Sequence, residues 1–247
     1  MVKPLATTRR TCCPARWRAG LLASCIFTSW LGSAAAVDLS QLASISRNDQ
    51  VSSLRLALTQ GAQSAVGKLG VADGFFGNPE VRIPLPGKLK KAESALRMLG
   101  YGSQVDSLVQ AMNRAAEAAV PEARVLLVDS IRQMSVTDAA AILTGDPDSA
   151  TQYVRRTASA KLTQQFLPIV RRSTSQLGVA QRYNELGGKL AQAGLLGPEE
   201  STIEGYVTQK ALDGLFLMIS REEAAIRQNP LGQSSKLLQK VFGAIRL

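Results

Sequence analysis

Apolar residues recur at spacings of three and four along nearly the whole chain after Asn48, which is typical of helices that bury one face. The first stripe runs from Val51 to Leu69, with Asn48 or Asp49 placed to cap it and Gly70 to end it. Comparable stripes cover residues 89–99, 105–119, 125–134, 137–143, 153–170, 179–190, 203–219 and 237–242. The pattern predicts an all-α fold, a single globular multi-helix domain of roughly eight or nine helices.

Several residues mark where these helices should begin, bend or end. Pro121 should break the chain between two helices, and Pro168 should bend a long one. Thr137 can cap the short helix that follows it. Ser220 and Glu223 have the spacing of a capping box, which predicts that a fresh helix starts there.

One long connection, residues 70–87, has four glycines and three prolines together with Phe75, Phe76, Ile83 and Leu85. An exposed loop has no need of such large apolar residues, so we expect an ordered crossover packed on the core. The alternative is a rigid lip over a binding groove, since long ordered loops often carry binding residues. Val81–Ile83 is the one short candidate for a strand.

The first 36 residues form a separate segment, with five basic residues, then an apolar run from Gly20 to Leu31, then small residues to Ala36. That order is typical of a secretory signal peptide cleaved near Ala36. We therefore expect a signal peptide (1–36), a flexible N-terminal segment (37–47) and an all-helical domain (48–247) in a periplasmic or secreted protein. The run is too short for a membrane span. The alternative is a lipoprotein acylated at Cys25.

Missing residue types narrow the possible chemistry. The sequence has no histidine, and its three cysteines (Cys12, Cys13 and Cys25) all precede Val37. The chain from Val37 therefore has no disulfides, and it has no residues for a zinc site of Cys/His type or a nucleophile activated by histidine. We expect no cofactor and no metal. Removing the leader lowers the formal net charge from +10 to +5, and aromatic residues make up only 5% of the sequence. We therefore expect no nucleic-acid partner, but peripheral contact with an anionic envelope surface is possible.

Several longer motifs resemble the bacterial DUF4197 family, exported helical proteins of unknown function, over about Val51 to Phe242. They are Phe75–Pro86, Met112–Glu117, Ile142–Gly145, Ala150–Tyr153, Phe166–Val170 and Tyr206–Phe216. The resemblance implies a helical fold, a bacterial source and export. It implies no catalytic or binding residue.

Candidate site residues come from the helix predicted over 105–119 and from the 70–87 connection. Asn113 and Glu117 share one helix face and Arg114 lies beside Glu117, so the three could bind an anionic group or form a structural ion pair. The candidates from the connection are Phe75, Phe76 and Arg82.

Other acidic and basic residues offer weaker alternatives. Glu117 with Glu122 or Asp129 could in principle hydrolyse cell-wall glycan with paired carboxylates. A mechanism based on Lys210 would need that lysine to be buried. Asp146-Pro147-Asp148 lacks the spacing of a calcium loop.

The leading hypothesis is a non-enzymatic envelope module that binds a protein partner or an apolar or anionic small ligand. An envelope hydrolase that uses carboxylates and a structural oligomeric scaffold are the alternatives.

Overall fold

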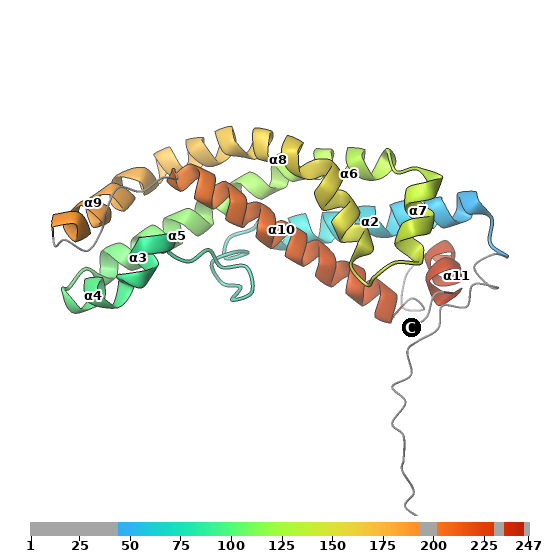
Figure 1. Cartoon of the computed structure of the whole chain (residues 1–247), viewed down its shortest axis with the longest axis horizontal. Coiled ribbons are helices and arrows are strands. Elements are labelled where there is room, and N and C mark those ends of the chain that lie inside the picture. The colour runs from blue at the N-terminus through green and yellow to red at the C-terminus, as the bar shows by residue number, and fades with distance from the viewer. Residues whose placement is uncertain (1–43, 193–201, 230–234, 245–247) are drawn as a thin grey trace, which may run out of the picture. The chain divides into compact units, whose positions relative to one another are not determined.

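The computed structural model describes residues 44–192, 202–229 and 235–244, all within one compact unit of the chain (Figure 1). The expected signal peptide, its three cysteines and the start of the flexible segment lie outside these residues. Every regular element in the described ranges is a helix, which confirms the all-α prediction. None of these helices is both long and apolar enough to cross a membrane.

From α3 to α9 the helices follow one another with short connections, and the 70–86 loop is the long connection between α2 and α3. In chain order they are α2 (Arg47–Leu69), α3 (Gly87–Lys91), α4 (Glu93–Met98), α5 (Gly102–Ala119), the 3₁₀ turn η1 (Val120–Glu122), α6 (Ala123–Arg132), α7 (Val136–Leu143), α8 (Ser149–Gln176), α9 (Val179–Gln192), α10 (Ile203–Gln228) and α11 (Lys236–Ala244). The break predicted at Pro121 is the 3₁₀ turn between α5 and α6.

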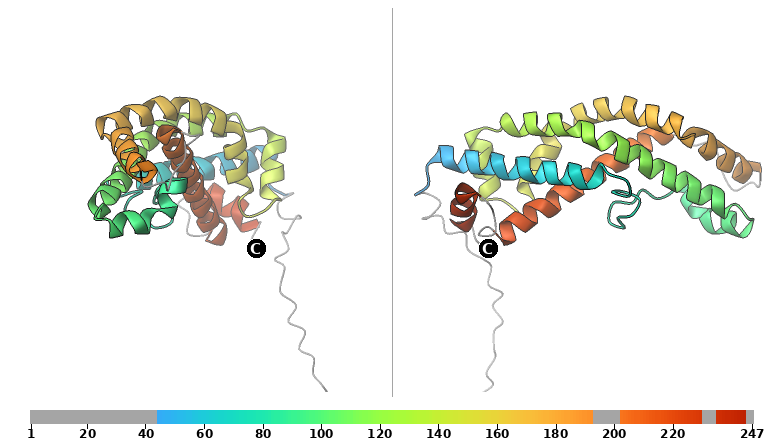
Figure 2. Two further views of the ribbon diagram at one scale, coloured as in Figure 1. Left: turned by 60° about the vertical axis from the view of Figure 1, so that its left-hand side comes forward. Right: turned by 180° about the vertical axis from the view of Figure 1, so that it is seen from behind.

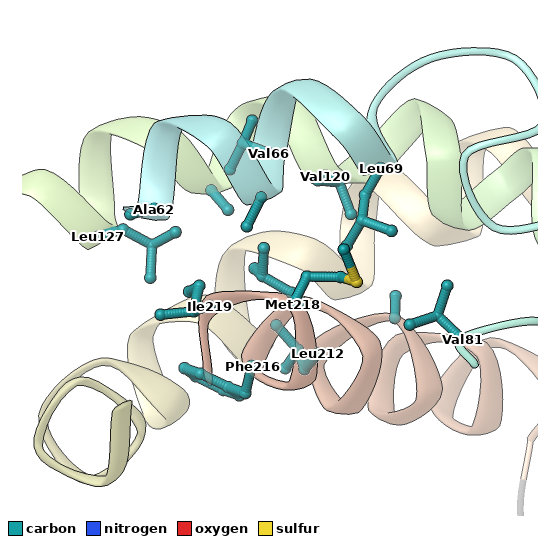
Figure 3. Close-up of a cluster of buried hydrophobic side chains, with 14 of the residues drawn as sticks. Ala62, Val66, Leu69, Val81, Val120, Leu127, Leu212, Phe216, Met218 and Ile219 are labelled. Atoms are coloured by element: carbon teal, nitrogen blue, oxygen red, sulfur yellow. The ribbon is translucent and has the colours of Figure 1, made fainter. Parts of the chain in front are cut away.

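The core forms where α10 crosses α8 and α2, its two most extensive neighbours (Figures 1 and 2). Figure 3 shows the α2 side chains Ala62, Val66 and Leu69 facing Met218 and Ile219 of α10. All five are at most 9% exposed. This dry interface stabilises the fold because each large aliphatic side chain buried there contributes about 1.5–3 kcal/mol.

Helix α8 buries every fourth residue over most of its length. The residues of this stripe are Ala150, Val154, Ala158, Leu162, Phe166, Val170 and Thr174, and Thr151 and Tyr153 are buried beside its start. Four residues advance by slightly more than one turn of 3.6, so the buried stripe shifts by about 40° at each step. The helix can therefore pack against α10, α5, α6 and α7 in turn, and Pro168 lies within it.

The predicted helix starts were wrong at two places. Ser46, not Asn48 or Asp49, caps α2, and its hydroxyl accepts the Asp49 amide at 3.1 Å. Ser135, not Thr137, caps α7 by forming a capping box with Asp138. In both cases the serine precedes the first buried residue of its helix by several positions, so the apolar pattern placed the start too late.

Two predicted helix boundaries also differ. The segment predicted as one helix over 89–99 is divided at Ala92 into α3 and α4. The fresh helix predicted at Ser220 does not exist, because α10 continues unbroken to Gln228. Glu223 has another partner, the start of α8.

Candidate functional site

The loop over residues 70–86 is an ordered crossover between α2 and α3, as expected. Phe75, Val81, Ile83 and Leu85 are all buried, with Phe75 fully excluded from solvent. Val81–Ile83 is not a strand, since the loop has only turns and irregular backbone. An irregular segment in the core must find partners for its backbone N–H and C=O groups. Turns within the loop provide some of these partners, and side chains of α5 provide others.

Glu117 of α5 holds the first half of the loop. Its Oε1 accepts the backbone amides of Phe75 at 3.0 Å and Phe76 at 3.1 Å, while its Oε2 accepts Nη1 of Arg114 at 2.7 Å. The Glu117 side chain is only 5% exposed. A buried carboxylate is tolerated when it is hydrogen-bonded and paired with a cation, and both conditions are met here.

Asn113, one turn before Glu117, holds the second half of the loop. Its Oδ1 accepts the Ile83 amide at 2.8 Å, and its Nδ2 donates to the Ile83 carbonyl at 2.9 Å and to the Val109 carbonyl at 2.7 Å. The amide side chain thus satisfies both backbone groups of one buried residue. Asparagine suits this position because its amide carries both a donor and an acceptor.

Close packing under the loop requires a glycine on α10. A Cβ at Gly214 would lie 2.8 Å from Cε1 of Phe75 and 3.2 Å from Cβ of Val81. The phenyl ring therefore lies directly against the helix backbone. The glycine of the Tyr206–Phe216 motif has this packing role.

Arg114 connects the loop entrance to the buried carboxylate. Besides Glu117, it contacts Asp73, with Nη2 at 2.8 Å from Oδ1. Asp73 adopts a left-handed φ of 66°, which carries a steric cost for a residue other than glycine. The hydrogen bond and charge of Glu117 raise the pKa of Arg114 above its usual range. Asp73, Arg114 and Glu117 thus form an ion-pair network. For Arg114 and Glu117 the sequence predicted either anion binding or a structural ion pair, and the structure contains the ion pair.

Phe76 and Arg82 lie at the outer surface of the same loop. The Arg82 guanidinium lies 4.4 Å from the centroid of the Phe76 ring, and that of Arg114 lies 5.9 Å from it. Arg82 is exposed and has no ion-pair partner within the described ranges. The six predicted residues therefore lie in the loop or against it. Asn113 and Glu117 bind its backbone from α5, Phe75 anchors it in the core, and Arg82 is exposed on its outer side.

Arg82 lines a surface groove of about 430 Å³ between the loop and helices α3, α4 and α5. The groove residues are Pro79, Arg82, Pro84, Leu85, Lys90, Glu93, Arg97, Asp106 and Val109. Its volume lies within the usual range of small-molecule sites, roughly 300–1,000 Å³. Asn113 holds the backbone of this wall at Ile83, between the lining residues Arg82 and Pro84.

Ion pairs satisfy most of the other charges in this groove. Lys90 lies 2.8 Å from Glu93, and Arg97 bridges Glu93 at 3.1 Å and Asp106 at 2.7 Å. Lys90 lowers the pKa of Glu93 through a hydrogen bond, with Arg97 acting in the same direction, and Arg97 lowers the pKa of Asp106. The charge of Arg82 also lowers the pKa of Asp106, but Arg82 forms no ion pair with either carboxylate, whereas Lys90 and Arg97 do.

The sequence interpretation did not identify the groove residues that come from α3, α4 and α5. The spacings Lys90–Glu93 (i, i+3) and Glu93–Arg97 (i, i+4) are standard helical ion-pair spacings and could have been found. Asp106 could not, because it lies on the next helix and meets Arg97 only after the chain turns at Gly100.

The alternative catalytic candidates have other roles or none in the structure. Both Glu117 oxygens already accept hydrogen bonds, and Glu122 and Asp129 are exposed. Lys210 is 42% exposed and lies 3.6 Å from Asp213, so it is not the buried lysine that a nucleophilic mechanism needs. Within the described ranges, no cluster of three or more acidic, histidine or cysteine side chains could hold a metal ion.

A second buried carboxylate, Glu223 of α10, was not recognised as a functional or structural centre from sequence. It accepts the amides of Ala150 at 3.1 Å and Thr151 at 2.8 Å, and also the Thr151 hydroxyl at 2.8 Å. Arg227, one turn later, pairs with it at 2.9 Å and is itself 8% exposed. Glu223 therefore caps the start of α8 from another helix, where a negative charge also suits the helix dipole.

Beside Glu223, an apolar cavity of about 10 Å³ lies between α2, α10 and α11. That volume is close to what a single water molecule needs and far below that of a lipid chain. An apolar ligand in this part of the core is therefore not supported by the packing.

The matched family region coincides with the described helical unit. A family model described as "Protein of unknown function (DUF4197)" matches residues 44–243, while no curated protein and no solved structure matches the chain. The motifs that carry the resemblance include the loop, its clamp on α5 and the capped start of α8. The chain belongs to the DUF4197 family of proteins of unknown function.

Proposed function

We propose that this protein is a non-enzymatic binding module of the bacterial envelope that takes an anionic group of a ligand in the groove at Arg82. The observation that carries the proposal is that Arg82 is exposed at the groove, without an ion pair, on a loop whose backbone is held in place. Its guanidinium stacks on Phe76 at 4.4 Å, and the Phe76 backbone is held by the buried Glu117. A cation without a carboxylate partner, on a loop fixed from inside, loses little conformational freedom on binding.

An anionic ligand is favoured over an apolar one by the groove's composition. It combines a free guanidinium with paired charges and a few apolar side chains, among them Leu85 and Val109. Guanidinium groups recognise carboxylates and phosphates through parallel N–H donors. The export expected from the N-terminal segment places candidate ligands among phosphate esters and acidic sugars of the envelope. No specific observation favours the two alternative hypotheses, an envelope hydrolase and an oligomeric scaffold.

The proposal is tested by amide chemical shifts in two-dimensional NMR. Glycerol 3-phosphate and N-acetylmuramic acid are titrated, with glycerol and N-acetylglucosamine as uncharged controls. We expect shifts of groove amides with the charged probes only. Arg82→Gln should weaken binding by about 10-fold or more, since a hydrogen bond to a charged group contributes roughly 1.5–3 kcal/mol.

Arg124→Gln is the matched control, because Arg124 is an exposed arginine on α6 outside the groove. It should leave the shifts unchanged. The proposal is rejected if neither anion shifts the groove amides, or if both substitutions weaken binding equally.

A further inference from the structure

The turn between α4 and α5 exposes two adjacent large apolar side chains. Met98 is 88% exposed and Leu99 is 62% exposed, the highest value and one of the next highest among large apolar residues of the described ranges. Other exposed examples, such as Val125 and Val71, have no large exposed apolar residue beside them in the sequence. A contiguous exposed apolar pair indicates a contact site more strongly than isolated residues do.

This turn has a fixed backbone. The Tyr101 amide donates to the Leu96 carbonyl at 2.9 Å and the Gly100 amide donates to the Arg97 carbonyl at 3.1 Å. With Gly100 at a φ of +86°, these bonds form a Schellman motif, the usual C-terminal cap of a helix. Leu96 is fully buried beneath the turn. Met98 and Leu99 are therefore held outward by an ordered cap.

Basic residues flank the apolar pair. Helix α3 reads Gly-Lys-Leu-Lys-Lys, and Lys91 is exposed with no ion-pair partner in the described ranges. Lys90 and Arg97 add cations whose partners are Glu93 and Asp106. Figures 1 and 2 show α3 and α4 beside the start of α5 and away from α2. The cations of α3 and α4 thus lie close in sequence to the exposed apolar pair at the end of α4.

We propose that the α4–α5 turn (Met98–Tyr101) inserts Met98 and Leu99 into the interface of an anionic phospholipid bilayer, with Lys91 of α3 contacting lipid phosphates. The chemistry suits that partner, because peripheral binding combines buried apolar side chains with attraction between lysines and anionic lipids. An apolar protein groove without acidic residues would contact the apolar pair but leave the basic flank without a partner, and a dimer is an outcome that the test distinguishes. The inference is independent of ligand binding at Arg82.

Vesicle sedimentation tests the proposal, using vesicles of phosphatidylcholine alone and with phosphatidylglycerol mixed in. Binding is expected only to the mixed vesicles and should fall as salt is added. The double change Met98→Ser with Leu99→Ser should weaken vesicle binding at least about 10-fold. The reason is that burial of one large apolar side chain strengthens binding by roughly 10- to 100-fold. Val125→Ser is the matched control, since Val125 is 67% exposed on α6.

Charge reversals locate the electrostatic contact. Lys91→Glu should weaken binding about 30-fold, because each basic residue near the surface contributes about 1 kcal/mol and a charge reversal counts twice. Lys161→Glu, at an exposed lysine of α8, should have little effect. If Lys161→Glu is the damaging change, the protein binds through α8 and the proposal is wrong.

A tryptophan reporter measures insertion directly. Both tryptophans of the sequence, Trp17 and Trp30, precede Val37, so Leu99→Trp gives the processed chain a single indole. Its emission should shift to the blue on mixed vesicles, while that of Val125→Trp should not. Intact mass verifies that all variants have the same N-terminus, and circular dichroism verifies that they are folded.

Three further results would also overturn the inference. These are no binding to mixed vesicles, an unshifted Leu99→Trp emission on bound protein, or a dimer in analytical ultracentrifugation that the serine double variant dissolves. The last would make the turn a contact between two copies of the chain.

Discussion

The sharpest prediction concerns the charge of Glu117. Substitution Glu117→Gln keeps the side-chain shape and one carbonyl oxygen that can still accept the Phe75 and Phe76 amides. It removes the negative charge from both bonds, at about 1 kcal/mol each, since hydrogen bonds to charged groups contribute roughly 1.5–3 kcal/mol and neutral ones roughly 0.5–1.5 kcal/mol. It also removes the partner of Arg114, whose guanidinium is 30% exposed, for about 1 kcal/mol more. We expect a loss of about 3 kcal/mol.

The assay is urea unfolding followed by circular dichroism. The midpoint should fall without a change in slope, because the surface exposed on unfolding is the same. In a thermal scan the loss corresponds to a Tm lower by about 6–12 °C for a domain of this size. Glu122→Gln is the control, an exposed glutamate five positions later, and should change stability by at most about 0.5 kcal/mol.

Two further measurements show whether the loop is what the charge stabilises. Hydrogen exchange of the Phe75 and Phe76 amides should accelerate in Glu117→Gln more than that of α10 amides. Arg114→Met should cost less than Glu117→Gln, since it leaves both amide bonds in place. The reasoning is refuted if Glu117→Gln is as stable as the Glu122 control, or if exchange at the two amides is unchanged.

Three other substitutions test the remaining structural centres by the same unfolding assay. Glu223→Gln should cost about 3–5 kcal/mol because it leaves a buried arginine without its partner, and a loss below 1 kcal/mol would contradict the cap on α8. Gly214→Ala should cost about 1–3 kcal/mol, because the added methyl group would overpack against the Phe75 ring. Gly67→Ala is the control and should stabilise by about 0.5–1 kcal/mol, because this exposed helical position has open space around it. Equal effects of the two substitutions would refute the packing argument. Ser135→Ala should cost about 1 kcal/mol at neutral pH. Because the Ser135 hydroxyl lowers the pKa of Asp138, that contribution is present above the ordinary carboxyl pKa and is lost as pH falls through the lowered one, so the gap from wild type must shrink in acid.

The six candidate residues show how far sequence reasoning reached toward the site. Spacing correctly put Asn113 and Glu117 on one helix face and Arg114 beside the carboxylate. It did not show that these side chains bind a loop some 30–40 positions earlier, since hydrogen bonds such as that from the Ile83 amide to Asn113 leave no periodic trace. The apolar content of residues 70–87 did indicate a loop packed on the core.

The errors have a common cause, which is that local signals compete with partners elsewhere in the fold. Ser220 and Glu223 have capping-box spacing, yet Glu223 caps α8, a helix more than 70 positions earlier in sequence. Where the signal is local and uncontested, as for the glycine after α2, the prediction succeeded, because Gly70 is the C-cap residue of α2 and its amide donates to the Val66 carbonyl.

By itself the sequence determined the fold class, the order of the helices and the absence of histidine, which rules out chemistry that needs an imidazole. Those properties follow from residue types and from a periodicity set by the 3.6-residue turn, both of which act locally. Only the tertiary structure decided which buried carboxylates are structural and which cation, Arg82, is left free at a groove. Such assignments depend on distances between segments far apart in the chain, and packing alone fixes those distances.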